Sequence, residues 1–376
     1  MTTILFFPFN LLSHYLRCLV LADSYDKRTH NILFLSSSTY DKYVIEHGFE
    51  RFNCEQFDSD HVMNCSKNFD FSWLNEIDIE RIVAAQISAI INLKADMVVG
   101  DTAPSLKMAA EYTNVSYVAL MNGYMTKYYS ETRQVPKMHR AYKLLSELPV
   151  PVSNGITGFA ERITFRKIHK PFRTLRKKYN LKPVNDYISE LEGDENLICD
   201  LPELFPQKTL PGNYKFTGPL IYQYKTEEAN WLNELPNKPI ICVCMGSTGD
   251  WKKLSFLNDP YYAKYLIIAA GDLDKVLYAD HIISKDFVNL TQVLRRTSLL
   301  ICHGGNGTIY SGIMAGVFMI CLSNNFEQEW NLKALEKYGY GKSADRFDDL
   351  IWREEIENAV KKAIIIEIPI VTSELV

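Results

Sequence analysis

The stretch SLLICHGGNGTIYSGIMAGVFMICLSNNFEQEWN, residues 298–331, carries the strongest structural signal in the chain and decides the fold. It opens with an apolar run, Ser298–Cys302, which is followed by a glycine-rich turn at 304–307. A helical pattern then covers Thr308–Ala315, and a second apolar run covers Val317–Leu322. Strand, turn, helix and strand in this order predict one unit of a parallel α/β sheet.

The turn before the helix has the features of an anion site, most often one for phosphate. A glycine-rich turn that leads into a helix presents backbone N–H groups at the positive end of the helix dipole. His303 adds a side-chain donor at the end of the first strand, and Glu327 and Gln328 follow the second strand, where sugar hydroxyls would be read. The simpler alternative is a turn that binds no ligand.

Four elements of this stretch together resemble the donor-sugar signature of the family 1 glycosyltransferases, the superfamily of UDP-glycosyltransferases and macrolide glycosyltransferases. In that family the pattern runs His-Gly-Gly-x-Gly-Thr, then Gly-Val-Pro, then Asp-Gln, with Asn shortly after. The sequence departs from it at Phe318, Glu327 and Ser311, which stand where the family has Pro, Asp and, in plant members, a ribose-binding Glu. The matching residues are His303–Thr308, Gly316–Val317, Glu327–Gln328 and Asn331.

The resemblance implies the α/β GT-B fold, in which two Rossmann-like domains face each other across a cleft. Residues 1–215 would form the N-terminal acceptor-binding domain, and residues 216–376 the C-terminal domain that binds the nucleotide sugar. The Pro- and Gly-rich segment Asp200–Pro219, which ends in the Gly-Pro common to the family, is the expected connection. The implied co-substrate is a nucleotide-diphosphate sugar, with UDP-sugar favoured over TDP-sugar, and no other cofactor or metal is expected.

The first 35 residues predict another parallel unit. A strand at Thr3–Phe7, a helix from His14 and a strand at Asn31–Leu35 form a βαβ pattern. Ligands of such sheets bind at the carboxyl ends of the strands, and His14 lies just beyond the first of them. A lone histidine is usually structural, but the resemblance implies that His14 is the general base that takes the proton of the acceptor hydroxyl.

A carboxylate is expected to orient this base, as in other catalytic pairs. Asp101 follows the apolar strand Asp96–Gly100, and the resemblance assigns it that role; the alternative is a cap at the start of the next helix. The strand Val115–Met121 ends at Asn122 and Gly123, which are expected to line the acceptor site.

Further strands are predicted at Pro239–Cys244, Tyr265–Ala269 and Val276–Ala279. The first of these ends in a small-residue loop, which relatives place near the donor phosphates. Phe287 matches the position on which the donor base stacks, with the alternative that it is a core residue, and the backbone of Val288 would read the edge of the base. The donor-binding residues that the resemblance implies are Gly246, Ser247, Thr248, Phe287, Val288, His303, Gly305, Asn306, Gly307, Thr308, Glu327 and Gln328.

The composition is that of a globular protein large enough for two domains. The chain has 376 residues, of which 47% are hydrophobic and 23% are charged, and its net charge of −4 argues against a nucleic-acid partner. Its eight cysteines form no CxxC pair, which favours a reduced, cytoplasmic setting. No apolar run is long enough for a membrane span. The pair Asp58 and Asp60, in a polar stretch with no preceding strand, is not expected to hold a metal.

Residues 162–182, RITFRKIHKPFRTLRKKYNLK, are strongly basic and contain no acidic residue. Apolar residues interleave with the cations, so one interpretation is a weak contact with an anionic membrane surface, where the protein would be peripheral. The simpler interpretation is a solvated helix, broken near Pro171, that packs on its domain. An anionic acceptor would also suit these cations.

The function implied is inverting transfer of a sugar from a nucleotide-diphosphate sugar to a hydroxyl group of a natural product, a lipid-linked sugar or a glycan. One alternative is a catalytically silent GT-B relative that binds a nucleotide sugar or activates a partner enzyme. Ser13 and Thr29 favour it, because they replace the glycines that precede the family's first two histidines. A second alternative is a sugar-nucleotide epimerase, which would act without an acceptor.

Overall fold

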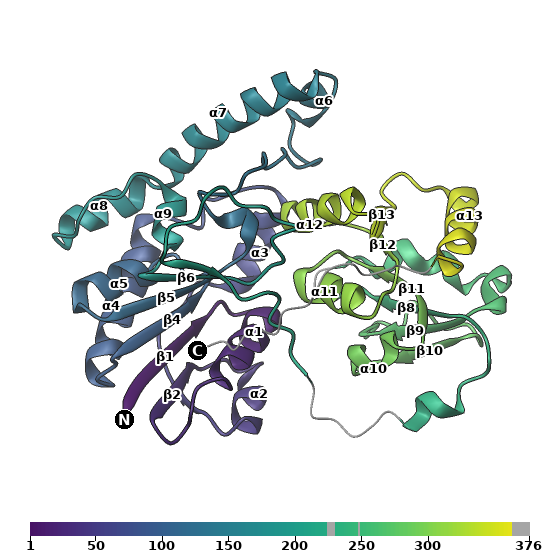
Figure 1. The fold of residues 1–376 in the computed structure, drawn as a ribbon, viewed down its shortest axis with the longest axis horizontal. Helices are drawn as coiled ribbons and strands as arrows, with labels where there is room; N and C mark the ends of the chain where they lie inside the picture. Colours follow the sequence, from purple (N-terminus) through teal and green to yellow (C-terminus); the bar gives the residue numbers. More distant parts are fainter. Residues whose placement is uncertain (224–229, 247–248, 363–376) are drawn as a thin grey trace. The chain divides into compact units, whose positions relative to one another are not determined.

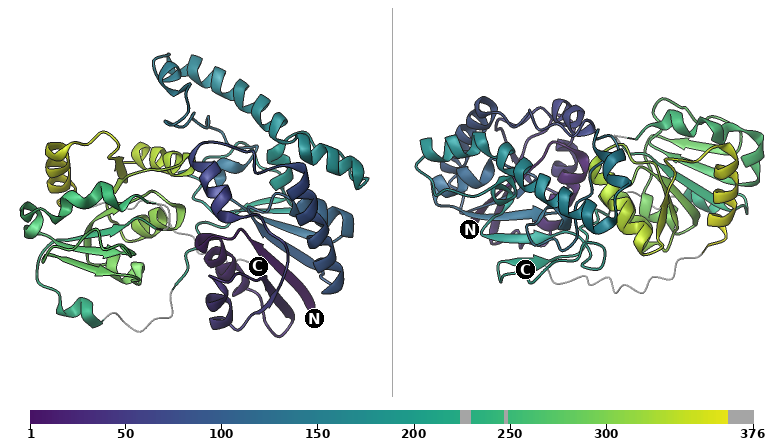
Figure 2. Two further views of the ribbon diagram at one scale, coloured as in Figure 1. Left: turned by 180° about the vertical axis from the view of Figure 1, so that it is seen from behind. Right: turned by 90° about the horizontal axis from the view of Figure 1, so that it is seen from above.

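The computed structural model describes residues 1–223, 230–246 and 249–362. The chain divides after Tyr222 into two compact units. Each unit is built on a sheet of parallel strands with helices packed against it (Figures 1 and 2). The predicted α/β class with two Rossmann-like sheets is therefore confirmed. The division lies beyond the boundary expected after residue 215, because β7 (Tyr214–Phe216) pairs with β6 (Glu195–Ile198) in the first sheet.

The first sheet has seven parallel strands in the described residues, in the order β3-β2-β1-β4-β5-β6-β7. Its other strands are β1 (Thr2–Pro8), β2 (His30–Leu35), β3 (Glu50–Phe52), β4 (Met97–Asp101) and β5 (Ser116–Met121). Its helices are α1 (Leu12–Ala22), α2 (Asp41–Glu46), α3 (Ser59–Lys67), α4 (Glu76–Asn92), α5 (Leu106–Thr113), the 3-10 turn η1 (Gly123–Met125), α6 (Tyr142–Ser146), α7 (Val150–Ile168), α8 (Lys170–Lys178) and α9 (Tyr187–Leu191).

The strand order of the first sheet reverses between β1 and β4. The chain goes from β1 to β2 on one side, and from β4 to β5 on the other, although β1 and β4 are neighbours. In an open parallel sheet, the carboxyl ends of the two strands at such a reversal border the ligand site. β1 ends at Pro8 and β4 ends at Asp101, and these two residues are paired in register. This first reversal is therefore the expected place for a site in the first unit.

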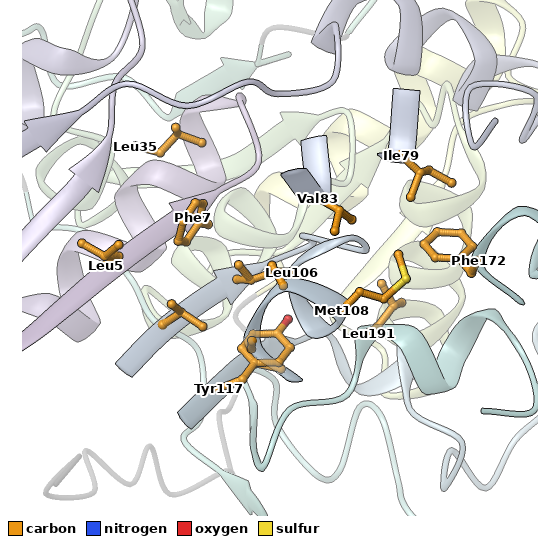
Figure 3. Close-up of a cluster of buried hydrophobic side chains, with 14 of the residues drawn as sticks. Leu5, Phe7, Leu35, Ile79, Val83, Leu106, Met108, Tyr117, Phe172 and Leu191 are labelled. Atoms are coloured by element: carbon orange, nitrogen blue, oxygen red, sulfur yellow. The ribbon is translucent and has the colours of Figure 1, made fainter. Parts of the chain in front are cut away.

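The core of the first unit holds the two strands of the reversal in place. All residues of β1 after its first two are buried, as expected for a parallel strand that is covered on both faces. On one face the core brings together Phe7 of β1, Val83 of α4, Leu106 of α5, Tyr117 of β5 and Phe172 of α8 (Figure 3). The strand ends that carry the site are thus anchored by packing on several helices.

The second unit repeats this plan with six parallel strands in the described residues, in the order β10-β9-β8-β11-β12-β13. Its order reverses between β8 and β11, which defines the second reversal. The strands are β8 (Ile240–Cys244), β9 (Leu266–Ala270), β10 (Ile282–Lys285), β11 (Thr297–Cys302), β12 (Met319–Cys321) and β13 (Gly341–Ser343). The helices are η2 (Asn230–Glu234), η3 (Trp251–Asn258), η4 (Pro260–Lys264), α10 (Leu290–Leu294), α11 (Asn306–Met314), α12 (Phe326–Lys337) and α13 (Asp349–Val360).

The strand predicted at Val276–Ala279 is wrong, and β10 begins only at Ile282. The backbone N–H groups that would pair in a strand donate instead to side-chain oxygens. The carboxylate of Asp272 accepts from the N–H groups of Val276 and Leu277 at 3.0 and 2.7 Å. The amide oxygen of Asn258 accepts from the two N–H groups that follow, at 2.8 and 3.2 Å. These local bonds compete with the ladder of a sheet and hold the segment as a loop.

The basic stretch 162–182 covers the end of α7 and all of α8. The helix break expected near Pro171 is present, because α7 ends at Ile168 and α8 begins at Lys170. Among the helices of the described residues, none is both long enough and apolar enough to cross a membrane.

Candidate active site

The first reversal brings together the two residues predicted to be catalytic. His14 lies in the first turn of α1, just after β1, and Asp101 is the fully buried last residue of β4. The Nδ1 atom of His14 lies 3.0 Å from Oδ1 of Asp101, but this oxygen lies off the direction of the ring N–H, so the alignment of a hydrogen bond is missing. The alternative that Asp101 caps a helix is wrong, because α5 begins at Leu106, after Ser105.

Arg17 is a third member of this site, and the sequence patterns did not indicate it. Its Nε donates to Asp101 Oδ2 at 2.8 Å, and its Nη2 donates to Asp101 Oδ1, so the guanidinium holds both oxygens of the carboxylate. Arg17 is itself buried. A spacing of three residues on α1 places Arg17 on the same side as His14, and this spacing is the signal that would have revealed it.

Arg17 dominates the electrostatics of the first reversal. Burial alone would raise the pKa of Asp101, but the charge of Arg17, and then His14, hold the pKa of this carboxyl well below its usual range. Burial likewise opposes the charged form of Arg17, yet Asp101 raises the pKa of the guanidinium. Asp101 and Arg17 therefore form a buried ion pair, and His14, whose side chain is more exposed than either, contacts Asp101.

The predicted acceptor residues lie beside this pair, after the end of β5. Nη1 of Arg17 donates to Oδ1 of Asn122 at 2.5 Å, so Asn122 belongs to the same network. The backbone N–H of Gly123 donates to Asp200 at 2.5 Å. A Cβ on Gly123 would lie 2.6 Å from Cβ of Phe205, so this position is packed closely inside the unit. Asn122 thus connects the strand end to the ion pair, whereas the N–H of Gly123 already has a partner.

A shallow pocket lies at the carboxyl ends of β1 and β4, and its empty space of about 360 Å³ includes open solvent. Phe9 lines it and also packs edge-on against the ring of His14, with ring centroids 5.8 Å apart, so the pocket begins beside His14. Phe57 contributes a further apolar wall. Gln56 and Gln86 also line the pocket, and the Oε1 atom of each is buried without a hydrogen-bond partner in the described residues. Two such oxygens are ready to accept from hydroxyl groups of a ligand.

At the second reversal, His303 follows the end of β11 and is held between two glycines. A Cβ on Gly246, which follows β8, would lie 2.7 Å from Cε1 of His303, and Gly246 has a φ of +54°. A Cβ on Gly305 would lie closer still to the same ring. Both positions therefore require glycine, because the imidazole occupies the space that any side chain would need.

His303 is uncharged at neutral pH in this setting. Burial lowers the pKa of His303 to about 4, although the backbone of Cys244 favours the charged form. Its Nδ1 atom is buried and has no hydrogen-bond partner in the described residues. His303 can therefore offer a hydrogen bond to a ligand, but not a positive charge.

The helix that follows, α11, begins at Asn306, with Gly305 as its N-cap, rather than at Thr308. The N–H of Thr308 was expected to donate to the diphosphate. In the structure it donates to the carbonyl of Gly305 at 3.1 Å, so this N–H already has a partner. Gly307 is exposed, and a Cβ placed there would meet no atom within 4 Å. The approach to the helix N-terminus is thus open at Gly307.

The residues predicted to read the sugar lie at the start of α12. The side-chain oxygen of Gln328 accepts from the N–H of Asn324 at 2.7 Å, and Asn325 caps the helix by accepting from the N–H of Gln328 at 3.0 Å. Gln328 is buried, whereas Glu327 is only partly buried. Asn331 donates to the carbonyl of Gly304 at 3.0 Å and so joins α12 to the glycine-rich turn. Gln328 and Asn331 are therefore used at least in part to hold the loop before α12 and the glycine-rich turn.

The remaining donor residues precede α10 or follow β8. Phe287 is 46% exposed, so the alternative that it is a core residue is wrong. Val288, beside it, is partly buried. Ser247 and Thr248 lie outside the described residues.

The Asp-x-Asp pair of the first unit has a structural use. The carboxylate of Asp58 caps α3 and accepts from the N–H groups of Asp60 and His61 at 3.0 and 3.1 Å. Within the described residues, no group of three or more His, Cys, Asp or Glu side chains is placed to hold a metal.

Comparisons with known proteins place this geometry among glycosyltransferases, although no family model matches the chain. The chain is similar to a PGL/p-HBAD biosynthesis rhamnosyltransferase of Mycobacterium bovis, with 24% identity over 343 residues, which cover 88% of this chain and 74% of the relative. A PGL/p-HBAD biosynthesis glycosyltransferase of Mycobacterium tuberculosis is 26% identical over 343 residues, 88% of this chain and 77% of the relative. An inactive PGL/p-HBAD biosynthesis glycosyltransferase of Mycobacterium bovis is 25% identical over 247 residues, 63% of this chain and 64% of the relative.

Solved structures agree on the fold. The glycosyltransferase of kitacinnamycin matches with a TM-score of 0.72 and 14% identity, and covers 100% of this chain and 93% of that chain. The glycosyltransferase VinC, in complex with DTDP, matches with a TM-score of 0.64 and 16% identity, and covers 96% of this chain and 92% of that chain. The GT-B fold and the expected resemblance to the family 1 glycosyltransferases are thereby confirmed.

Proposed function

We propose that this GT-B glycosyltransferase moves a sugar, with inversion, from a nucleotide-diphosphate sugar to a hydroxyl group of an acceptor. The observation that carries the proposal is the 3.0 Å contact between His14 and the buried Asp101 at the first reversal. An imidazole held by a buried carboxylate is the arrangement of a general base. The loose alignment of this contact is ordinary before substrates bind, since catalytic hydrogen bonds often tighten only in the complex.

The proton path follows from which ring nitrogen is engaged. Nδ1 of His14 faces Asp101, so Nε2 is the atom that takes the proton of the acceptor hydroxyl. The acceptor oxygen attacks the anomeric carbon, and the bond from that carbon to the diphosphate breaks, with its electron pair leaving on the diphosphate. Attack from the face opposite the leaving group inverts the anomeric centre. Asp101 stabilises the imidazolium that forms.

Arg17 acts in this scheme as a positioning residue. Its two bonds fix the carboxylate of Asp101, and its third bond fixes Asn122.

The donor is proposed to bind at the second reversal. The N-terminus of α11 and a neutral hydrogen bond from His303 would stabilise the departing diphosphate, with no metal ion. The ring of Phe287, which is 46% exposed, would stack on the base of the nucleotide. Glu327 would hold the hydroxyls of the sugar, while Gln328 holds the loop that carries it. UDP-sugar and TDP-sugar remain the two candidate donors.

The acceptor is proposed to occupy the pocket beside His14. Phe9 and Phe57 suit an apolar or aromatic body, and the oxygens of Gln56 and Gln86 suit hydroxyl groups on it. A hydroxyl-bearing natural product or lipid-linked sugar has both features.

The experiment that tests the donor site is thermal unfolding in the presence of UDP, TDP and GDP, for the wild type and for His303→Ala. A nucleotide at about a hundred times its dissociation constant should add roughly 2.7 kcal/mol to the free energy of unfolding. Stabilisation by one nucleotide, lost in His303→Ala, would support the donor site and identify the base. Absence of stabilisation by all three would contradict it.

A second candidate is a silent relative that binds a nucleotide sugar without transferring the sugar. Two observations favour it: Asp101 is shared with Arg17, and one relative is named as inactive. Hydrolysis of the donor separates the two functions, because a silent protein should hydrolyse a donor no faster than its own His14→Ala variant does. Conversion of the donor to an epimer without any acceptor would instead favour an epimerase.

A further inference from the structure

Helix α7 carries an apolar stripe on the side that faces solvent. Val152, Ile156, Phe159 and Ile163 follow each other at spacings of four, three and four residues, which places them on one side of the helix. Their exposed fractions are 50%, 46%, 60% and 51%, so about half of each side chain is in contact with water. These four residues, the solvent stripe, form a continuous apolar surface rather than scattered exposed positions.

Helix α7 directs few apolar side chains towards its own unit before its last turns. Its buried residues are Ser153 and Thr157, both polar, and its apolar contacts with the core of the first unit, Phe165 and Ile168, come only after the stripe has ended. A helix that packs on a core normally directs its apolar side inward. Packing within the first unit therefore does not explain the solvent stripe. In Figures 1 and 2, α7 extends outward past the rest of the first unit towards α6.

The charges around the solvent stripe have one sign. Arg162, Arg166 and Lys167 are exposed on α7, close to the stripe. Glu161 is the single acidic residue in the sequence from 150 to 178, and it is paired with Arg133. The exposed ionised groups of α7 are therefore all cations.

Helix α8 continues this basic surface and is firmly anchored. Phe172 and Leu175 lie in the core of the first unit. Arg176 is buried against Glu190, to which its Nη2 and Nε donate at 2.7 and 2.6 Å, and against Glu111. The other cations of α8 that point to solvent are Lys170, Arg173, Lys177 and Lys178, of which Lys178 contacts Glu80. One side of α8 thus holds the unit together, and the other extends the positive surface of α7.

We propose that α7 lies on an anionic lipid surface, with the solvent stripe inserted among the headgroups and the cations of α7 and α8 against the lipid phosphates. A helix with an apolar stripe flanked by Lys and Arg suits the boundary between headgroups and acyl chains, into which such stripes enter by roughly 5–10 Å. A second copy of the chain fits less well, because the cations on either side of the two stripes would be brought together. The inference goes beyond sugar transfer and does not depend on it.

The test is co-sedimentation of the full chain with vesicles of phosphatidylcholine, with and without phosphatidylglycerol. Binding should require phosphatidylglycerol and should weaken as salt is added. The double variant Phe159→Gln/Ile163→Gln should lower the partition coefficient at least about tenfold, because it removes the half of the stripe that lies next to the cations of α7. Arg166→Gln and Lys167→Gln should each lower it about fivefold.

A matched control is the double variant Ile77→Gln/Leu350→Gln. Ile77 and Leu350 are 80% and 75% exposed and belong to α4 and α13, so neither is part of the solvent stripe and their loss should leave vesicle binding unchanged. Thermal unfolding and stabilisation by nucleotide should be the same in all variants, which separates this proposal from the donor site. Absence of binding to phosphatidylglycerol vesicles would overturn the proposal. Equal binding by the stripe variant would also overturn it, as would a dimer that only the stripe variant disrupts.

Discussion

The two strand reversals of the molecule have the same strand topology, but one carries charged groups and the other carries neutral ones. At the first, β1 and β4 end in a charged group: Asp101 is ionised and fully buried, Arg17 holds both of its oxygens, and His14 contacts it. At the second, β8 and β11 end in glycines and in His303, whose pKa burial lowers to about 4. The same topological position thus holds an ion pair in one unit and neutral hydrogen-bond donors in the other.

This difference fits the two halves of a transfer reaction. A base that gains a proton needs a negative charge beside it before the substrate arrives, and a buried carboxylate supplies one. A site for a diphosphate receives its charge from the ligand, so uncharged N–H groups and a helix N-terminus are sufficient. The resting charge of each reversal therefore corresponds to the proposed role of its unit.

The largest expected effect concerns the buried ion pair of the first reversal. Asp101→Asn should lower the free energy of unfolding by about 3–5 kcal/mol, because Arg17 would remain buried without its counter-charge. Urea unfolding measures this change. The double variant Asp101→Asn/Arg17→Met should be less destabilised than the single variant, since it removes the unpaired charge. If both lose the same stability, the ion pair is not what holds the first reversal.

His14→Ala should separate chemistry from donor binding. Loss of a general base typically lowers the rate constant about 100-fold or more, so donor hydrolysis should fall by that factor. Stabilisation by nucleotide should persist, because the donor is proposed to bind at the second reversal. The His303→Ala variant should show the reverse, with stabilisation by nucleotide lost. Hydrolysis at the wild-type rate in His14→Ala would refute the role of this residue.

Acid should weaken the second unit before it weakens the ion pair of the first. The pKa of His303 is lowered from 6.5 to about 4, so between these values the unfolded chain binds a proton that the folded chain does not. Stability therefore falls as the pH falls through this window, by about 2 kcal/mol at pH 5.

The contribution of Asp101 to the free energy of unfolding is lost in a different pH range. The pKa of Asp101 is lowered by Arg17, so its stabilisation is complete above the ordinary carboxyl pKa and is lost only below it. Urea unfolding of the wild type and of His303→Gln, measured from pH 7 to pH 5, isolates the histidine. A constant difference between the two proteins over this range would contradict the buried neutral state of His303.

Gly307→Ala should have the smallest effect on stability, and it tests the donor site selectively. A Cβ at this position meets nothing within 4 Å, so stability should stay the same or rise by up to about 1 kcal/mol. Nucleotide affinity should nevertheless fall at least about tenfold, or about 1.4 kcal/mol, because the methyl group covers the N-terminus of α11. Gly158→Ala on α7 is the control, since its added Cβ also meets nothing within 4 Å. Unchanged affinity in Gly307→Ala would place the phosphates elsewhere.

Most of the fold was predictable because most of its parallel strands are short apolar runs. The runs that became β1, β4 and β11 were recognised in this way. The strand expected at Val276–Ala279 failed because Asp272 and Asn258 take its backbone N–H groups. The apolar pattern was present there, but side chains from elsewhere in the chain satisfied the backbone first.

Part of the candidate site was predictable from the sequence, but Arg17, which holds the carboxylate of Asp101, was not. The positions of His14, Asp101 and His303 at strand ends followed from the sequence. The solvent stripe of α7 did not, because the spacing of apolar residues on a helix is the same whether that side faces the core or water.

The sequence alone determined where the chain turns and which polar residues follow its strands. Both depend on apolar runs and glycines, whose effects extend over only a few neighbouring residues. Only the tertiary structure decided which groups meet. Arg17 and Asp101 are 84 residues apart in sequence, yet their contact sets the charge of the first reversal. His303 is neutral because it is buried, and its ring lies against Gly246, which is 57 residues away in sequence, as well as against its neighbour Gly305. Electrostatic energies depend on distance and on exclusion of water, and both are properties of the folded chain.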